Sequence, residues 1–212
     1  MVEQDPSVAT IRDGLTVLPL RTPTLPPATH TNTVLVGYER VWIVDPATPH
    51  DDQRRRLLDV LDDHAAQGRI PHAIVLTHHH PDHVGAAAWL SGERALPIHA
   101  HATTRMLLSD HVPVHETLAE GDVLAGSGRP DDQWHVLHTP GHASGHIVLW
   151  QPERRALIGG DMVAAVGTII IEPPDGHMAT YITQLQRLAS LEPEWLVPAH
   201  GQVIEAPVAH LQ

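Results

Sequence analysis

The chemistry of this chain is concentrated in one short run of metal-binding side chains. The run T-H-H-H-P-D-H-V-G follows a predicted buried strand at residues 73–77, and it fits the pattern H-x-H-x-D-H. Residues two apart in an extended segment point the same way, so His78 and His80 can grip one ion. Asp82 and His83 lie at the following turn and can reach a second ion. Because neutral imidazole and carboxylate groups are zinc-class ligands, the run predicts a site for two cations.

Further candidate ligands follow predicted strands elsewhere in the chain. They are Asp45, His142, Asp161 and His200. Open α/β sheets build their sites from residues at strand ends, so we expect these residues to converge. His79 points away from its neighbours in the run and is predicted to pack or to face solvent. His146 is a candidate for supporting a ligand.

Strand and helix signals alternate in both halves of the chain, which indicates an α/β or α+β fold. Short apolar runs predict strands at 33–37, 41–45, 73–77, 96–99, 134–139, 147–150, 156–159 and 195–197, and a short helix at 86–90. Residues 51–67 are predicted to form a helix because two aspartates open it and a glycine follows it. A second helix is predicted over 176–190, with Asp175 as its N-cap and with Met178 and Ile182 on its apolar face.

Composition limits the classes of function. The chain has 212 residues, 42% of them hydrophobic, which suits a single domain spanning residues 1–212. The net charge is −12 and all 13 basic residues are arginine, so nucleic acid is disfavoured as a partner, though not excluded, and membrane surfaces are not expected. No apolar run of about 18 residues and no secretory signal is present. Cysteine is absent, which excludes disulfides and thiolate ligands, and we expect a cytoplasmic protein.

The complete set of motifs resembles the five motifs of the metallo-β-lactamase superfamily, in order, from about residue 32 to residue 201. The resemblance implies an αββα four-layer sandwich with two metals between the sheet edges. The segments 31–33, 139–142 and 167–168 resemble two branches, one glyoxalase II-like and the other the lactamase-β-like endoribonucleases. Both branches carry an accessory C-terminal helical domain. We expect that domain to be absent here, because the sequence ends at Gln212, and whether this is the native end stays open.

The resemblance also implies a role for each candidate ligand. The first cation would be held by His78, His80 and His142, the second by Asp82, His83 and His200, and Asp161 would bridge them. Asp45 would support the ligand loop through hydrogen bonds without being a ligand. Asp82 would in addition be catalytic, orienting the hydroxide and shuttling a proton to the leaving group. We expect two Zn²⁺ ions, with iron or manganese as alternatives.

The implied function is that of a binuclear zinc-dependent hydrolase. A metal-bridged hydroxide would attack a small acyl substrate, namely a thioester, ester or lactone, in the manner of a hydroxyacylglutathione hydrolase. One alternative is a phosphodiesterase or endoribonuclease, and another is a di-iron redox or non-hydrolytic metal-binding protein. β-Lactam hydrolysis is a weaker alternative, because those enzymes usually have Cys or Ser where this chain has Asp161.

The substrate pocket is predicted with less support than the ligands. Residues 163–176 closely follow the bridging aspartate and are expected to form a substrate loop. The candidate pocket residues are His30, Asn32, His177 and Tyr181. The sequence leaves the natural substrate and the oligomeric state open.

Overall fold

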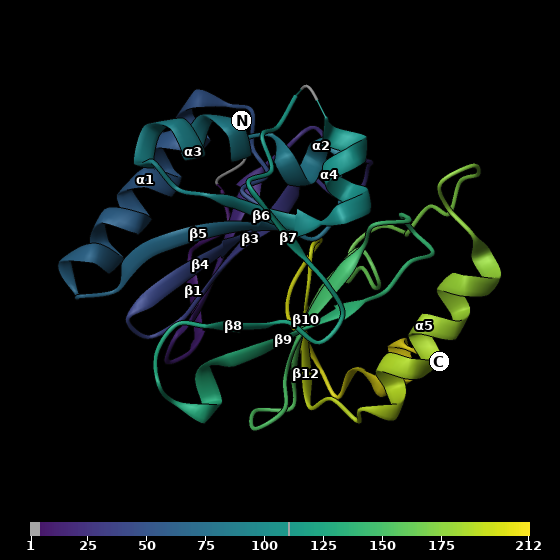
Figure 1. The fold of residues 1–212 in the computed structure, drawn as a ribbon. Helices are drawn as coiled ribbons and strands as arrows, with labels where there is room; N and C mark the ends of the chain where they lie inside the picture. Colours follow the sequence, from purple (N-terminus) through teal and green to yellow (C-terminus); the bar gives the residue numbers. More distant parts are fainter. Residues whose placement is uncertain (1–4, 110) are drawn as a thin grey trace.

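Two β-sheets face each other, and helices cover the outer face of each sheet (Figure 1). The structure is a computed structural model that describes residues 5–109 and 111–212. Its four layers run helix, sheet, sheet, helix along the described chain. The αββα fold expected from the sequence is therefore confirmed.

The first sheet contains seven strands that follow one another in chain order. They are β1 (Ala9–Arg12), β2 (Leu15–Arg21), β3 (His30–Val36), β4 (Arg40–Val44), β5 (Ile70–Leu76), β6 (Ile98–His101) and β7 (Glu116–Leu118). Neighbours from β1 to β4 pair antiparallel, and neighbours from β4 to β7 pair parallel. The parallel half brings the carboxyl ends of β4 and β5 to one edge.

The second sheet contains six strands in the order β13-β12-β11-β10-β9-β8. They are β8 (Val123–Ala125), β9 (Gln133–His138), β10 (Ile147–Gln151), β11 (Ala156–Gly160), β12 (Trp195–Pro198) and β13 (Ile204–Glu205). The neighbours β11 and β12 pair parallel, and the other neighbours pair antiparallel. Asp161 and His200, which follow this parallel pair, are thereby carried to the same edge.

Helices cover the two sheets unequally. The first sheet is covered by α1 (Asp51–Ala66), α2 (Pro81–Val84), α3 (Ala87–Arg94) and α4 (Ala102–Leu108), and the second by α5 (Met178–Ser190) (Figure 1). Two short 3₁₀ turns occupy Pro130–Asp132 and Pro207–His210. None of the helices in the described ranges combines the length and the apolar character needed to cross a membrane.

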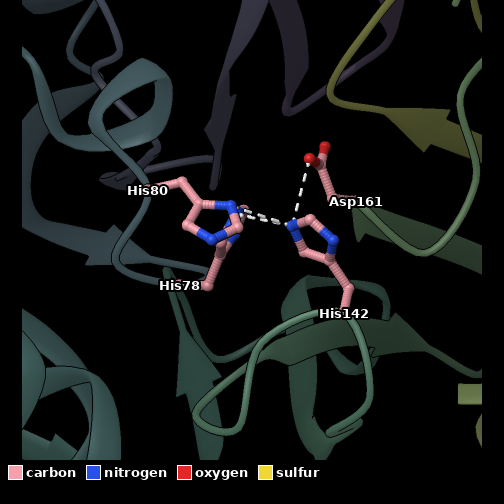
Figure 2. Close-up of side chains that lie close together, drawn as sticks. All are labelled: His78, His80, His142 and Asp161. Atoms are coloured by element: carbon pink, nitrogen blue, oxygen red, sulfur yellow. Dashed lines mark hydrogen bonds and ion pairs between the residues drawn. The ribbon is translucent and has the colours of Figure 1, made fainter. Parts of the chain in front are cut away.

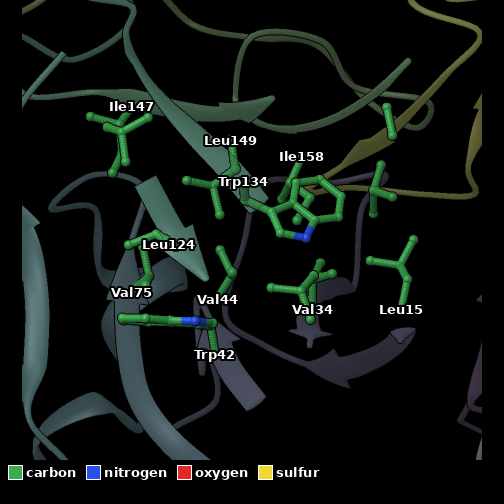
Figure 3. Packing of buried hydrophobic residues seen from close by; sticks show 14 of the residues in the cluster. Leu15, Val34, Trp42, Val44, Val75, Leu124, Trp134, Ile147, Leu149 and Ile158 are labelled. Atoms are coloured by element: carbon green, nitrogen blue, oxygen red, sulfur yellow. The ribbon is translucent and has the colours of Figure 1, made fainter. Parts of the chain in front are cut away.

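Alternation of side chains along the strands builds the layers. Trp42 and Val44 of β4 pack between the sheets, whereas Ile43 packs towards the helices. The layer between the sheets is aliphatic apart from a few tryptophans, and Trp134 from β9 fills its centre (Figure 3). Leu149 of β10 is fully buried in the same layer. These contacts fix how the two sheets face each other, and with them the positions of the strand ends.

The start of α5 corrects one expectation from the sequence. The N-cap is His177, whose Nδ1 accepts a hydrogen bond from the backbone N–H of Thr180, and not Asp175. Asp175 instead accepts a hydrogen bond from the backbone N–H of Ser144. Its carboxylate therefore ties the segment before α5 to the loop after β9.

The apolar face of α5 is also narrower than the sequence suggested. Tyr181, Leu185 and Leu188 pack against the second sheet. Met178 and Ile182 are 55% and 46% exposed. The apolar residues of this helix cover more than one face, so the pattern alone could not identify the buried part.

The layer between the sheets gives a prediction for stability. We expect Leu149→Ala to lower the free energy of unfolding by about 2–5 kcal/mol, because it leaves a cavity between two sheets that cannot collapse onto it. Urea denaturation measures this change. Val123→Ala is the control, since Val123 is 46% exposed and its truncation should cost less than about 0.5 kcal/mol. Equal effects of the two substitutions would contradict this description of the core.

Candidate metal centre

The predicted ligands converge where strands of both sheets end. The H-x-H-x-D-H run leaves β5 and enters α2, while His142 lies in the loop after β9. Asp161 directly follows β11, and His200 follows β12. These residues come from four separate segments, so the fold alone brings their side chains together.

Three imidazoles and one carboxylate form the first group (Figure 2). His142 Nε2 lies 3.2 Å from His78 Nε2 and 3.0 Å from His80 Nδ1. His78 Nε2 and His80 Nδ1 are 3.0 Å apart. Asp161 Oδ2 completes the group at 3.4 Å from His142 Nε2. The four ligand atoms therefore surround one small volume, as tetrahedral zinc ligands do.

The second group consists of Asp82, His83 and His200, and it lies around the other oxygen of Asp161. Asp161 Oδ1 is 3.4 Å from His83 Nε2 and 3.5 Å from His200 Nε2. His200 Nε2 is also 3.7 Å from Asp82 Oδ2. Asp161 thus presents one oxygen to each group, which is the arrangement of a bridging carboxylate between two cations.

The outer ring nitrogens identify the tautomers. His142 Nδ1 lies 2.8 Å from the carbonyl oxygen of Ile170, and His200 Nδ1 lies 3.1 Å from that of His30. A carbonyl oxygen only accepts, so each Nδ1 carries the proton and donates it. The inward Nε2 atoms of His142 and His200 therefore carry free lone pairs, as metal ligands require.

Asp45 supports one histidine of each group. Its Oδ2 lies 2.8 Å from His83 Nδ1 and accepts the hydroxyl hydrogen bond of Thr77 at 2.6 Å. Its Oδ1 accepts the backbone N–H of Thr77 at 2.8 Å. The Thr77 hydroxyl oxygen lies 3.0 Å from His78 Nδ1 and accepts from it. Thr77 was not singled out from the sequence, where its only signal is its place just before the histidine run.

His146 holds Asp161 from behind. It is fully buried, and its Nε2 accepts the backbone N–H of Asp161 at 3.1 Å. Its Nδ1 lies 2.8 Å from the Thr139 hydroxyl oxygen. The supporting role predicted for His146 therefore has a definite geometry, since this ring fixes the loop that carries Asp161.

Burial and charge give the centre its electrostatic character. Burial lowers the pKa of His80 to about 4 and holds the pKa of His78 well below its usual value, so both rings are neutral near pH 7. Burial also opposes a charge on His83, but the carboxylates of Asp161 and Asp45 raise the pKa of that ring well above its usual value. The field of these two carboxylates favours positive charge at this position.

Two buried atoms of the second group have no hydrogen-bond partner. They are His83 Nε2 and Asp161 Oδ1, which face each other. Buried polar atoms are rarely left unpaired in native proteins. A cation between them would satisfy both, so the residues present fit a metal ion.

A pocket of about 700 Å³ opens onto the centre. It is lined by Asp82, by the segment around Leu25 and by residues from Val166 to Asp175. The predicted substrate loop thus forms one wall of it. The Thr24 hydroxyl donates to Asp82 Oδ2 at 2.6 Å, so the opposite loop also reaches the ligands.

The four pocket residues expected from the sequence fall into two pairs: His30 and Asn32 line a neighbouring cavity, and His177 and Tyr181 lie at the start of α5. Asn32 Nδ2 donates to the carbonyl oxygens of Pro198 and Gly201, which holds the loop that carries His200. Tyr181 donates to the Met162 carbonyl oxygen at 2.7 Å, and His177 caps α5. His30 lines a neighbouring cavity and pairs with Asp5. None of the four lines the pocket over the metal centre in the described structure.

His79 is half-buried and packs outside both groups. Its Nε2 lies 3.9 Å from Asp175 Oδ2, and one atom each of His79, His80 and Asp175 lie within 4.8 Å of one another. The expectation that His79 points away from the centre agrees with this placement. The contact with Asp175 was not expected.

Comparisons with known proteins agree with this geometry. The family described as the metallo-beta-lactamase superfamily matches residues 26–200. A hydroxyacylglutathione hydrolase of Xylella fastidiosa (strain M23) is 35% identical over 161 residues, which cover 75% of this chain and 54% of that protein. A beta-lactamase-like protein 2 homolog of Caenorhabditis elegans is 32% identical over 139 residues, covering 64% and 44%. The chain spans about half the length of these curated relatives.

Solved structures extend the likeness to nearly the whole chain. TTHA1623, whose crystal structure is in a di-iron-bound form, is 30% identical with a TM-score of 0.72, covering 92% of this chain and 97% of that one. A beta-lactamase domain protein from Burkholderia ambifaria shares the fold, with 23% identity and a TM-score of 0.82. The match covers 99% of this chain and 77% of that one. With the family match over most of its length, the chain belongs to the metallo-beta-lactamase superfamily.

Proposed function

We propose that the chain is a metal-dependent hydrolase with two cations held at the centre, acting on a small acyl substrate. The observation that carries the proposal is Asp161, which directs one oxygen to each of two groups of inward-facing imidazole nitrogens. His78, His80 and His142 would hold one cation, and Asp82, His83 and His200 the other. Zinc suits these imidazole and carboxylate ligands best, while iron or manganese would fit the same donors.

The bound cations would supply an activated water and would stabilise negative charge on the substrate oxygen. The net reaction forms a bond between the acyl carbon and the oxygen of water and breaks the bond from that carbon to sulfur or oxygen. One proton of the water ends on the leaving thiol or alcohol, and the acid product releases the other. Asp82 lines the pocket and would carry a proton towards the leaving group, with Thr24 holding its carboxylate in place.

The charge around the centre supports an acyl substrate over a phosphodiester. Glu172 and Asp175 line the pocket in addition to Asp82 and Asp161, and no arginine lines its described walls. Binding of an RNA backbone draws on clustered lysine and arginine. An uncharged carbonyl group meets no repulsion from these carboxylates, and the curated relatives named hydroxyacylglutathione hydrolase are acyl hydrolases by name.

The ligand assignment predicts metal content. Purified protein loaded with zinc should hold about two ions per chain. We expect His80→Ala to lower the content to about one ion or fewer, because it removes a nitrogen that no neighbour replaces. Elemental analysis after gel filtration measures this. His79→Ala is the matched control, one residue away and outside both groups, and it should keep the full content. Loss of metal from the control would show that the ligand face is misassigned.

Asp45 gives a second prediction. Asp45→Asn should weaken metal affinity about 10–100-fold, because one of the two accepting oxygens becomes an NH2 group that faces a donor of Thr77 or His83. Competition with a chromophoric chelator measures the affinity. Asp59→Asn, on the exposed face of α1, removes the same charge without touching the centre. If both variants bound metal as tightly as the parent chain, Asp45 would have no part in positioning the ligands.

The reaction class is tested by a substrate panel. Zinc-loaded protein should hydrolyse short thioesters, esters or lactones, and Asp161→Ala should lower kcat/KM by more than about 100-fold, since loss of an outer partner alone costs about 10–100-fold. A single-stranded RNA is assayed in parallel. Cleavage of RNA with no turnover of any acyl compound would overturn the acyl assignment in favour of phosphodiester hydrolysis.

A further inference from the structure

A second cavity lies beside the pocket over the metal centre. Its volume is about 660 Å³, which is within the range of about 300–1,000 Å³ typical of small-molecule sites. Ile11, Val17 and Pro19 line it from β1 and β2, and Val203 closes it from the segment after His200. Aliphatic and proline side chains therefore form most of this wall.

The two cavities adjoin at two small aliphatic residues. Ala28 and Val166 line both of them. Val166 is 39% exposed, so its side chain faces open space, and it also lies against Gly201, where an added Cβ would come within 2.9 Å of Val166 Cγ2. Gly201 itself lines the second cavity. The two cavities therefore share a boundary at Ala28 and Val166, and the space on its far side from the metal centre is mainly apolar.

The nitrogen-bearing side chains of Asn32 and His30 in the second cavity are engaged with other protein groups, and Ser7 and Gln202 add only uncharged polar groups to its wall. Both hydrogens of the Asn32 side-chain amide are donated to carbonyl oxygens. His30 contacts the Asp5 carboxylate through Nε2 and the Thr29 hydroxyl through Nδ1. No arginine is among the described residues that line this cavity. The cavity thus offers apolar contact and little to pair with an anionic group.

Exposed aliphatic side chains continue the apolar surface on the metal side. Leu25 and Ile170 line the pocket over the centre and are 59% and 45% exposed. Large apolar side chains left in water at the rim of a pocket mark a surface that a ligand covers. The acidic side chains Glu172 and Asp175 lie in the same pocket and disfavour an anionic occupant.

We propose that the substrate carries an uncharged aliphatic acyl chain, and that this chain passes Ala28 and Val166 into the second cavity. The inference rests on the proposed hydrolase function and adds the substrate class. The reacting carbonyl lies at the metal centre, and the second cavity selects the length of the acyl chain. Ile11 and Val17 are specificity residues in this arrangement, because they contact only the part of the substrate remote from the reaction.

The test measures kcat/KM for thioesters of one uncharged thiol with acetyl, butyryl, hexanoyl and octanoyl groups, using zinc-loaded protein. Each buried methylene contributes about 0.8 kcal/mol, so kcat/KM should rise about fourfold per methylene until the cavity is filled. A thioester of glutathione with a lactoyl group is assayed beside them and should be a poorer substrate than the octanoyl thioester.

Three tryptophan substitutions, two in the cavity wall and one control, test whether the acyl chain binds in the second cavity. Ile11→Trp fills the second cavity and should lower the ratio of octanoyl to acetyl kcat/KM at least tenfold. Thr10→Trp is the control, because Thr10 lies next in the same strand, is exposed and does not line the cavity. It should leave the ratio unchanged. Ser7→Trp, in an exposed part of the cavity wall, repeats the test without burden on the core.

The possible outcomes distinguish failure of the acyl-chain proposal from failure of the proposed hydrolase function. Turnover of the acetyl thioester with no dependence on chain length overturns the inference and leaves the hydrolase intact. A rising series that Ile11→Trp and Ser7→Trp fail to flatten also overturns it, because the chain then binds elsewhere. Preference for the lactoyl thioester of glutathione over the octanoyl thioester overturns the aliphatic substrate class. Failure to hydrolyse any acyl compound defeats the proposed function itself.

Discussion

The rest of the centre depends on one buried carboxylate, Asp161. A carboxylate withdrawn from water is destabilised by several kcal/mol unless donors or cations surround it. The backbone carbonyls of Ile170 and His30 accept hydrogen bonds from Nδ1 of His142 and His200, so in the neutral rings the inward nitrogens cannot donate to Asp161. The lone pairs of these imidazole nitrogens and the negative charge of the Asp161 carboxylate therefore face one another in both groups. Such a set is stable with cations between its members, which is why the geometry supports two metal ions more strongly than any single ligand does.

The fold keeps these side chains in place because the loops that carry them are anchored to strands of the two sheets. Each candidate ligand lies in a segment that follows a strand, and the inward side chains of these strands are packed between the two sheets (Figure 3). Asp45 then couples the two groups, because it contacts His83 directly and His78 through Thr77. Gly141 lets the His142 loop lie against α5, since a Cβ there would come within 2.4 Å of Tyr181 Cα and its φ is +141°. Tyr181 thus belongs to the support of the centre.

The sequence indicated which distant side chains converge better than it indicated the walls of the pocket, and the reason is physical. Alternation in an extended segment indicated that His78 and His80 share a face, and strand ends predicted which distant residues would join them. The pocket walls come from segments without periodicity, such as 22–29 and 163–176, where a residue's direction depends on loop geometry that no pattern encodes. Asn32 illustrates the difference. It was predicted to line the substrate pocket, and its amide is used by two backbone carbonyl groups. A side chain's hydrogen-bond partners are a property of the folded neighbourhood and not of its spacing in the chain.

The separation between ligands that follow strands and pocket walls that lie on loops explains why a metal centre does not by itself define a substrate. Activated water attacks any carbonyl held at the right distance, so discrimination among substrates must come from contacts remote from the reacting carbon. In the described structure two loops supply aliphatic residues to the pocket wall, Leu25 and Ala28 from one and Val166 and Ile170 from the other. All four side chains are aliphatic, and the cavity behind Ala28 and Val166 is lined mostly by apolar residues as well. A relative that kept every ligand and replaced these side chains by charged ones would retain the chemistry and take a different substrate. Two proteins that share the ligand residues are therefore expected to share the class of reaction. Their substrates have to be inferred from the side chains on the loops around the pocket.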